Sequence, residues 1–392
     1  MLRWAGVLTG GALAGGVLTG GVLTLLAAPR LQAKKSIVTL LEPPDGHGLR
    51  LWPGLRARVV ARSGEFPPGT SGYRWHEAPD GGAVFPAPDG DGDSAKGGGW
   101  VYVSNSESRR GKAGAGALRF DAGGNLVSAY PILTGTERNC AGGATPWGTW
   151  LSCEEHSRGR VWECDPFGQN PAVARPALGV FAHEAAAVDP VRGEVYLTED
   201  IPDGLLYRFT PTRRGDLSQG RLEGAFVKRG SMEVRWIPVP DPLAKTRPTR
   251  RQLSRGTIFN RSEGIVHYQG RIVFATTGDH RLWSYDIAAR KISVLYDARR
   301  HPNPPVTSPD NLAVSRGGTL LIAEDGGELK IVARTPEGVF RPIVQLAGHP
   351  RSEPAGQALD PSGTRLYFSS QRGAAGRRSQ GITYEISGLK LG

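Results

Sequence analysis

Two of the three cysteines of the chain lie in one short acidic stretch, "TGTERNCAGGATPWGTWLSCEEH", at positions 134–156. Cys140 stands in its first half, and Cys153 is followed directly by a Glu-Glu-His run. A thiolate prefers a transition metal, whereas carboxylates are the usual ligands of hard cations such as Ca²⁺. A cysteine among so many oxygen ligands therefore points to a site that holds more than one kind of metal.

The third cysteine, Cys164, is a possible disulfide partner for Cys153. "TWLSC" and "RVWEC" flank a short polar turn and both have the composition of strands, so a disulfide between Cys153 and Cys164 is expected if the strand register brings them together. Cys140 would then be the odd thiol of an exported chain, and metal coordination would protect it from oxidation.

A repeat in the sequence indicates which secondary-structure elements position these residues. A glycine turn, a hydrophobic strand, a polar cluster and a second strand recur at intervals of mostly about 45 to 50 residues. Such strands begin near Trp100, Thr149, Glu194, Arg271, Thr319 and Thr364. Four-stranded propeller blades occupy about this length of chain. Together with 55 glycines and 30 prolines, the repeat predicts an all-β fold, a six-bladed β-propeller, over residues 36–392.

In a propeller, equivalent positions of all blades converge near the central channel. The polar clusters at these positions contain Asn105 and Glu107, Cys153 to His156, Glu199 and Asp200, Asp279, and Glu324 with Asp325. Packed carboxylates repel one another, and burial adds to the cost of their charge. Bound Ca²⁺ or Mg²⁺ would relieve both effects. The alternative is that each acid caps the turn of its own blade.

Several motifs resemble those of the PhoX-type alkaline phosphatase family. They are, in chain order, "VSNSE", "NCAGGATPWGTWLSCEE", "AHEA", "NRSEG", "SPDNLAV", "AEDGG" and "EPAGQALDPSGTRLYFSSQRG". The resemblance covers most of the chain from about Tyr102 to Gly373. It implies an exported bacterial phosphatase with six propeller blades and a cluster of iron and calcium ions in the central channel.

The resemblance also implies roles for individual residues. Cys140 would bind iron, and the carboxylate ligands would be Glu155, Glu184, Glu263 and either Glu324 or Asp325. Arg261 would bind the phosphate, although a salt bridge to Glu263 is an equally good explanation of this arginine. Residues that would support the ligands are Asn105, Glu107, Glu154, His156 and His183; for both histidines a structural role in the core is the alternative.

These observations lead to three functional hypotheses. The first is a metal-dependent phosphatase that hydrolyses small phosphate monoesters. The second is a calcium-dependent propeller hydrolase such as a lactonase, and the third is a non-catalytic envelope propeller that binds a ligand or partner. Cys140 discriminates between them, because a calcium-only site does not need a thiol.

Charge and the N-terminus bear on localisation and partners. The net charge is +11, and residues 212–255 form a basic insertion that contains eleven Lys and Arg residues against four acids. No nucleic-acid-binding motif accompanies it, so nucleic acid is not the expected partner. Residues 1–35, with an uncharged run from Trp4 to Ala28, are expected to be a signal peptide or membrane anchor. We expect a monomer that is periplasmic, extracellular or anchored to the outer side of the cytoplasmic membrane.

Overall fold

The computed structural model describes residues 36–87 and 98–391, and the predicted leader at 1–35 lies outside them. The described residues contain strands and six short 3-10 helices but no α-helix. The 3-10 helices are η1 (Ile37–Leu40), η2 (Pro176–Leu178), η3 (Thr249–Gln252), η4 (Thr277–Asp279), η5 (Ala298–Arg300) and η6 (Arg378–Gln380). Within this described part, no helix has the length and hydropathy needed to cross a membrane.

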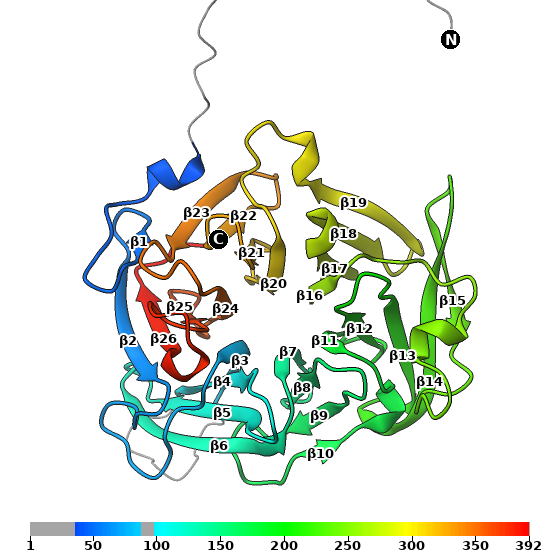
Figure 1. Cartoon of the computed structure of the whole chain (residues 1–392), viewed down its shortest axis with the longest axis horizontal. Helices are drawn as coiled ribbons and strands as arrows, with labels where there is room; N and C mark the ends of the chain where they lie inside the picture. The colour runs from blue at the N-terminus through cyan, green and yellow to red at the C-terminus, as the bar shows by residue number, and fades with distance from the viewer. Residues whose placement is uncertain (1–35, 88–97, 392) are drawn as a thin grey trace, which may run out of the picture. The chain divides into compact units, whose positions relative to one another are not determined.

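The strands form antiparallel sheets arranged around a common centre (Figure 1). One sheet consists of β3 (Pro79–Pro86), β4 (Trp100–Ser106), β5 (Ala113–Phe120) and β6 (Leu126–Thr136). The next consists of β7 (Asn139–Ala144), β8 (Trp150–Glu154), β9 (Val161–Cys164) and β10 (Val173–Ala174). In each, the chain moves outward from the centre strand by strand, which is the meander expected of a propeller blade.

A larger sheet follows, in which nine strands are connected. Its first meander is β11 (His183–Val188), β12 (Val195–Glu199), β13 (Leu206–Arg213), β14 (Asp216–Lys228) and β15 (Glu233–Pro238). Its second is β16 (Ser262–Tyr268), β17 (Arg271–Thr276), β18 (Arg281–Asp286) and β19 (Lys291–Asp297). The two meet through a single residue pair, Glu233 with Lys291. The described residues therefore form five sheets rather than the six separate sheets that the repeat predicts.

The last two sheets combine the two ends of the described chain. One contains β20 (Pro309–Val314), β21 (Leu320–Glu324), β22 (Lys330–Arg334), β23 (Phe340–Gln345) and, at its edge, β1 (Arg50–Leu51). The other contains β24 (Pro354–Leu359), β25 (Arg365–Ser370), β26 (Ile382–Ser387) and, at its edge, β2 (Arg56–Arg62). Because β1 and β2 pair with late strands, they tie the start of the propeller to its end.

The hydrophobic core lies between neighbouring sheets. Where the β3–β6 sheet faces the β24–β26 sheet, for example, Trp100 and Tyr102 pack with Tyr367 and are almost completely buried. The basic segment at 212–255 belongs to this framework, since it contains β14 and β15, and Leu217 and Leu222 of β14 are buried.

The innermost strand of every meander carries a register irregularity close to its N-terminal end. These strands are β3, β7, β11, β16, β20 and β24 (Figure 1). Such bulges re-aim side chains, and here they accompany close approach of neighbouring strands. A Cβ on Gly264 of β16 would lie 2.5 Å from the carbonyl oxygen of Asp310 in β20. The inner strands therefore meet tightly at one end of the central axis.

Candidate metal centre

The bulges bring acids and a thiol to the centre of the ring. Five inner strands place an acid or the thiol as their second residue: Asp80 in β3, Cys140 in β7, Glu184 in β11, Glu263 in β16 and Asp310 in β20. Glu353 directly precedes the sixth inner strand, β24. The same local position thus supplies a potential metal ligand from blade after blade.

Three of these carboxylates form the tightest group. Glu184, Glu263 and Asp310 each offer an oxygen, and these oxygens lie within 4.8 Å of one another. All three residues are buried, and neither carboxylate oxygen of Glu184 has a hydrogen-bond partner. Burial and the neighbouring acids raise the pKa of Glu184 and of Glu263 well above its usual range and that of Asp310 to about 7. A bound cation would satisfy this arrangement.

The thiol lies next to this group. Cys140 Sγ is 3.7 Å from Oδ2 of Asp80, and burial together with nearby carboxylates raises the pKa of the thiol. Gln371 donates a hydrogen bond of 2.5 Å to the same Asp80 oxygen and one of 3.3 Å to Glu107. Without a cation, the surroundings favour the neutral thiol; a transition metal would favour the thiolate.

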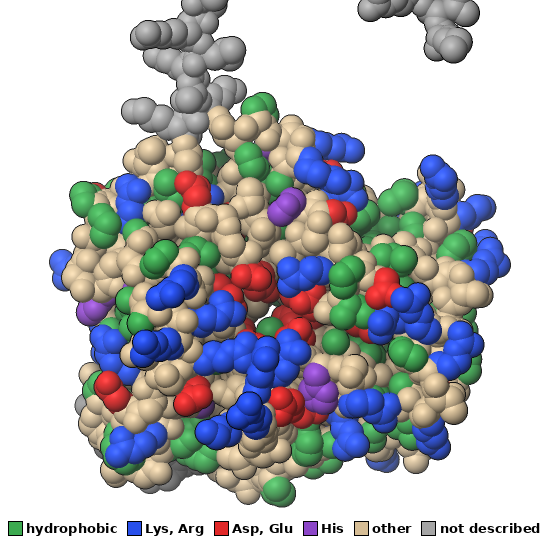
Figure 2. All heavy atoms as spheres, viewed as in Figure 1, with side chains coloured by type: hydrophobic (Ala, Val, Ile, Leu, Met, Phe, Trp, Pro, Cys, Tyr) green, Lys and Arg blue, Asp and Glu red, His purple; other side chains and the backbone are tan. Residues whose placement is uncertain are grey.

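Arginines line the acidic group on its open side. Figure 2 shows acidic side chains around the central hollow, with Lys and Arg side chains beside them. Four arginines contact these acids: Arg138 contacts Glu155 and Glu107, Arg261 contacts Asp200 and Glu263, Arg372 contacts Glu353, and Arg378 shares Glu107 with Arg138. The site therefore combines a carboxylate-rich floor with a cationic rim.

Arg261 is held firmly. Its Nε and Nη2 donate hydrogen bonds of 2.9 Å to the two oxygens of Asp200, and Nη2 also donates to Glu263 at 2.8 Å. The predicted salt bridge to Glu263 thus exists. Among the described residues, however, Nη1 has no hydrogen-bond partner, and about a third of the side chain is exposed. This edge of the guanidinium is free to bind a ligand.

The two predicted acids Glu324 and Asp325 have different surroundings. Glu324 is buried at the end of β21, where it accepts hydrogen bonds from the backbone of Thr307 (2.7 Å) and Lys330 (3.2 Å) and lies 3.4 Å from Lys330 Nζ. Its carboxylate is already satisfied. Asp325 is half-buried, and its charge influences the pKa values of Asp310 and Glu353 in the central group. Of the two acids, Asp325 is therefore the one whose charge acts on the central group.

Glu155 lies at the rim. It accepts a hydrogen bond of 2.8 Å from Arg138, and burial raises its pKa to about 7. Asn105 is completely buried. Its side-chain oxygen accepts hydrogen bonds from Trp150 (2.9 Å) and Ser152 (2.8 Å), and its amide group donates one to the backbone oxygen of Ala141 at 2.7 Å. It thereby fixes the strand that carries Cys140.

The remaining predicted supporting residues face other surroundings. Glu154 accepts hydrogen bonds of 3.1 Å from the backbone of Glu137 and Arg160, and His156 lies beside it at 3.9 Å. The His183 ring stacks on Phe181 and contacts Gly179 O at 3.0 Å, and its pKa is lowered to about 3 by burial. For His183 the structural explanation from the sequence fits these contacts.

The predicted disulfide between Cys153 and Cys164 is wrong, since all three cysteines are free. The register of β8 and β9 pairs Cys153 with Val161 and Cys164 with Trp150. The two thiols also enter different hydrophobic clusters, one on each side of the sheet. An offset of three residues on the partner strand puts the side chains on opposite faces, because side chains alternate along a strand.

Sequence reasoning missed several residues of the centre: Asp80, Asp310, Glu353, Arg138, Arg372, Arg378 and Gln371. A signal existed for two of them. Asp80 in "PDGG" and Asp310 in "PDNL" stand at the same position of the inner-strand pattern as the acids in "HEAA" and "SEGI". Aligning these short segments by their strand position would have found both.

Known proteins provide independent support for the family. Residues 94–162 and 156–286 match the family model described as alkaline phosphatase PhoX. None of the curated proteins matches the chain. Among solved structures, PhoX from Pseudomonas fluorescens in complex with vanadate, a transition-state analogue, is similar with a TM-score of 0.70 at 17% identity, over 88% of this chain and 97% of that chain.

Two further solved structures are more distant. A Bacteroides thetaiotaomicron protein of unknown function has a TM-score of 0.52 at 8% identity, over 85% of this chain and 76% of that chain. A gluconolactonase from Xanthomonas campestris has a TM-score of 0.49 at 12% identity, over 86% and 91% of the two chains. These likenesses concern the fold alone. The family model and the PhoX-like propeller fold, together with the ordered motifs, lead to one conclusion: the chain belongs to the alkaline phosphatase PhoX family.

Proposed function

We propose that this protein is a metal-dependent phosphatase that hydrolyses small phosphate monoesters at a centre of iron and calcium ions. The observation that carries the proposal is the convergence of the Cys140 thiol with buried carboxylates at the inner ends of successive blades, next to the open edge of Arg261. Phosphate binding needs both parts, since cations must offset the acids before an anion can approach them.

The donor set fits the proposed ions. Glu184, Glu263 and Asp310 would hold hard cations through carboxylate oxygens, and Cys140 would hold iron through its sulfur. Both carboxylate oxygens of Glu184 are buried without a hydrogen-bond partner, and this is the strongest support for a bound cation at this position. When bound, such cations would neutralise the acids and act as Lewis acids toward phosphoryl oxygens.

The residues of the chain itself would bind and orient the substrate. Arg261, held by Asp200 and Glu263, presents Nη1 to a phosphoryl oxygen without having to be ordered first. Arg138, Arg372 and Arg378 add positive charge around the opening and would attract a phosphate dianion. Small-molecule esters suit this arrangement because the reacting group must reach the floor of a central hollow.

We also propose that the propeller has six blades, with the nine-stranded sheet counted as two of them. The nine-stranded sheet contains two meanders that each start with an inner strand and an acid, Glu184 in β11 and Glu263 in β16. A single residue pair joins them. Counting them as two blades gives six inner strands around one centre. Export, an N-terminal signal or anchor and a monomeric state complete the proposal, and they stay expectations from the sequence.

The experiment that tests the function combines metal analysis with activity. The full chain, expressed with its own N-terminal segment, is analysed for iron and calcium, for visible absorption and for hydrolysis of p-nitrophenyl phosphate. Cys140→Ser should lose iron, the visible band and activity together. Cys164→Ala is the matched control, because that thiol is buried in a sheet core away from the centre. Calcium without iron, unchanged in Cys140→Ser, would contradict the proposal and support a calcium-dependent hydrolase or binding propeller.

A further inference from the structure

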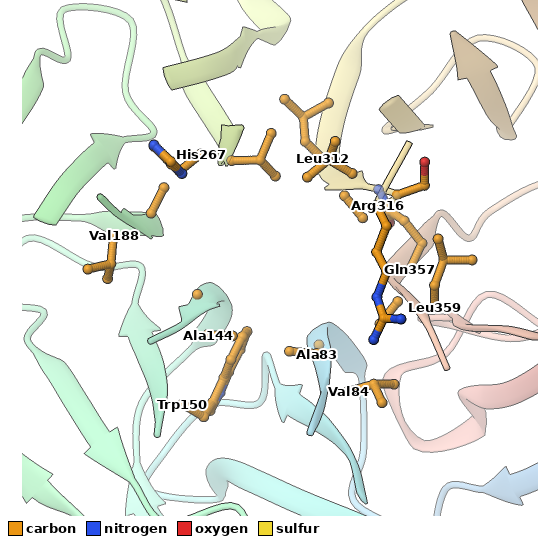
Figure 3. Close-up of a pocket in the computed structure, with 18 of the residues that line it drawn as sticks. Ala83, Val84, Ala144, Trp150, Val188, His267, Leu312, Arg316, Gln357 and Leu359 are labelled. Atoms are coloured by element: carbon orange, nitrogen blue, oxygen red, sulfur yellow. The ribbon is translucent and has the colours of Figure 1, made fainter. Parts of the chain in front are cut away.

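A cavity lies at the C-terminal ends of the inner strands, whereas the candidate metal centre lies at their N-terminal ends. It has a volume of about 580 Å³ and is lined by residues from all six inner strands, including Val84, Ala144, Val188, His267, Leu312 and Leu359 (Figure 3). We call it the axial cavity. Its size is that of a site for a small organic molecule.

The axial cavity is separate from the candidate metal centre. None of the acids of the centre lines it. On β3, for example, Asp80 belongs to the centre and Val84 to the cavity, so that on the order of 10 Å of strand separates them. A narrow space of about 30 Å³ lies between, lined by the strand residues that follow the acids, such as Gly81 and Ala185. A ligand in the axial cavity would therefore contact no residue of the metal centre.

Most residues that line the axial cavity are apolar or glycine, but polar atoms make up nearly half of its exposed wall. Figure 3 shows the Arg316 side chain extended along one side, opposite His267. Arg316 is an exposed residue, and among the described residues no acid pairs with it. The cavity also contains two buried polar atoms without partners, Nε2 of His267 and Oε1 of Gln357.

The acid that lines the cavity does not compensate this arginine. Asp360 accepts hydrogen bonds from the backbone of Thr364 (2.9 Å) and Arg365 (2.8 Å) and from the hydroxyl of Ser362 (2.6 Å). Its carboxylate is thus used within its own turn. A cavity lined mostly by apolar residues, with an exposed arginine that has no acid partner at its side, is complementary to a largely apolar molecule that carries a negative charge.

We propose that the axial cavity binds a small apolar molecule with a single anionic group, which Arg316 pairs. The apolar body lies against the aliphatic walls and Trp150, and the anionic group meets the guanidinium. This is a binding site in addition to the phosphatase centre, and it needs no metal.

The test uses two fluorescent probes with the same ring system. 8-Anilinonaphthalene-1-sulfonate carries one negative charge, and N-phenyl-1-naphthylamine is its uncharged counterpart. Both should bind the metal-free full chain in a saturable manner. Arg316→Gln should weaken binding of the sulfonate about 10- to 100-fold, the range expected for a hydrogen bond to a charged group, and leave the neutral probe nearly unchanged. Ala144→Phe, which fills the cavity from an exposed position, should weaken both.

Two controls locate the effect. Arg229→Gln removes an exposed arginine of the basic segment and should change neither probe. Inorganic phosphate, added with iron and calcium, should not displace the sulfonate. Unchanged sulfonate binding in Arg316→Gln, displacement by phosphate, or an equal loss in Arg229→Gln would overturn the proposal. Thermal unfolding of each variant shows that the comparison is made on folded protein.

Discussion

Arg138 and Arg261 occupy equivalent positions, each directly before an inner strand and each with a left-handed backbone, at φ of 50° and 53°. Ala78 and Ser308 do the same before β3 and β20. A side chain other than glycine pays roughly 1 kcal/mol for this conformation. At two of the four positions the residue is an arginine whose side chain contacts the acids of the centre. The turn before the strand therefore supplies the cation, and the strand itself supplies the thiol of Cys140 after Arg138 and the carboxylate of Glu263 after Arg261.

Substitution of Arg261 should affect catalysis more than folding. Arg261→Gln should lower kcat/KM for p-nitrophenyl phosphate about 10- to 100-fold, because a charge-assisted hydrogen bond to the phosphoryl group is lost. Arg261→Lys should recover only part of the loss, since lysine cannot reproduce the fork of bonds to Asp200. Steady-state kinetics measure the effect. Arg281→Gln, which removes an arginine paired with two acids elsewhere, is the control and should retain activity.

Glu324 and Asp325 should respond differently to the same conservative change. Glu324→Gln removes one of the two carboxylates beside the buried Lys330 amine, whose other partner is Glu328 at 2.8 Å, and it weakens the hydrogen bonds from the backbone of Thr307 and Lys330. The free energy of unfolding should therefore fall by about 1 to 2 kcal/mol. Asp325→Asn should leave stability within about 0.5 kcal/mol but reduce the bound calcium. Urea unfolding and elemental analysis distinguish the two. Loss of calcium in Glu324→Gln with unchanged stability would reverse the assignment.

Close packing of the inner strands predicts a strict requirement for glycine at position 264. A Cβ there would lie 2.5 to 2.9 Å from backbone atoms of Asp310, Asn311 and Leu312. Gly264→Ala should therefore destabilise the protein by about 2 kcal/mol or more, because backbone must move. Gly46→Ala is the matched control: a Cβ at that exposed position meets nothing within 4 Å. Equal unfolding midpoints for the two variants would show that the inner strands are less tightly packed.

The acids of the centre should make the metal-free protein sensitive to alkaline pH. The pKa of Asp310 and that of Glu155 are raised to about 7, mainly by burial, so the folded state binds more protons than the unfolded state above pH 4. Stability should therefore fall as pH rises from about 5 to 8, by about 5 kcal/mol for these two groups together, in the presence of a chelator.

Chemical unfolding at several pH values measures this slope. Glu184→Gln should flatten it by removing one buried carboxylate from the triad, and Glu337→Gln, on the surface, should not. Added calcium should raise stability most at high pH, where cations do not compete with protons. Stability that increases steadily with pH in the chelated protein would contradict the assignment of the buried acids.

The free state of the cysteines can be checked directly. After denaturation without a reductant, all three thiols should be alkylated, as measured by the mass of the intact chain. In the folded metal-free protein, Cys153 and Cys164 should react slowly because both are completely buried. A mass that corresponds to a single alkylated thiol would restore the disulfide that the hairpin composition suggested.

Much of the architecture was readable in the sequence because it depends on local patterns. Glycine turns, short strands with β-branched and aromatic residues, and their regular spacing predict antiparallel meanders, and these are present. Local patterns do not show, however, whether two neighbouring meanders form separate sheets or one connected sheet. The pairing of Glu233 with Lys291 joins two meanders, and it depends on how a turn after β14 meets the start of β19, which is a matter of tertiary packing.

By itself, the sequence determined that an acid-rich and thiol-containing centre is expected and named Cys140, Glu184, Glu263 and Arg261 among its residues. Only the tertiary structure decided which acids meet. Asp310 meets Glu184, more than a hundred residues away in the chain, and Glu263, about fifty residues away, at the bulged ends of the inner strands, whereas Glu324 of β21 is buried beside Lys330. The tertiary structure also decided that Cys153 and Cys164 do not form a disulfide. The strand register determines which face of the sheet each side chain occupies, and amino-acid composition does not.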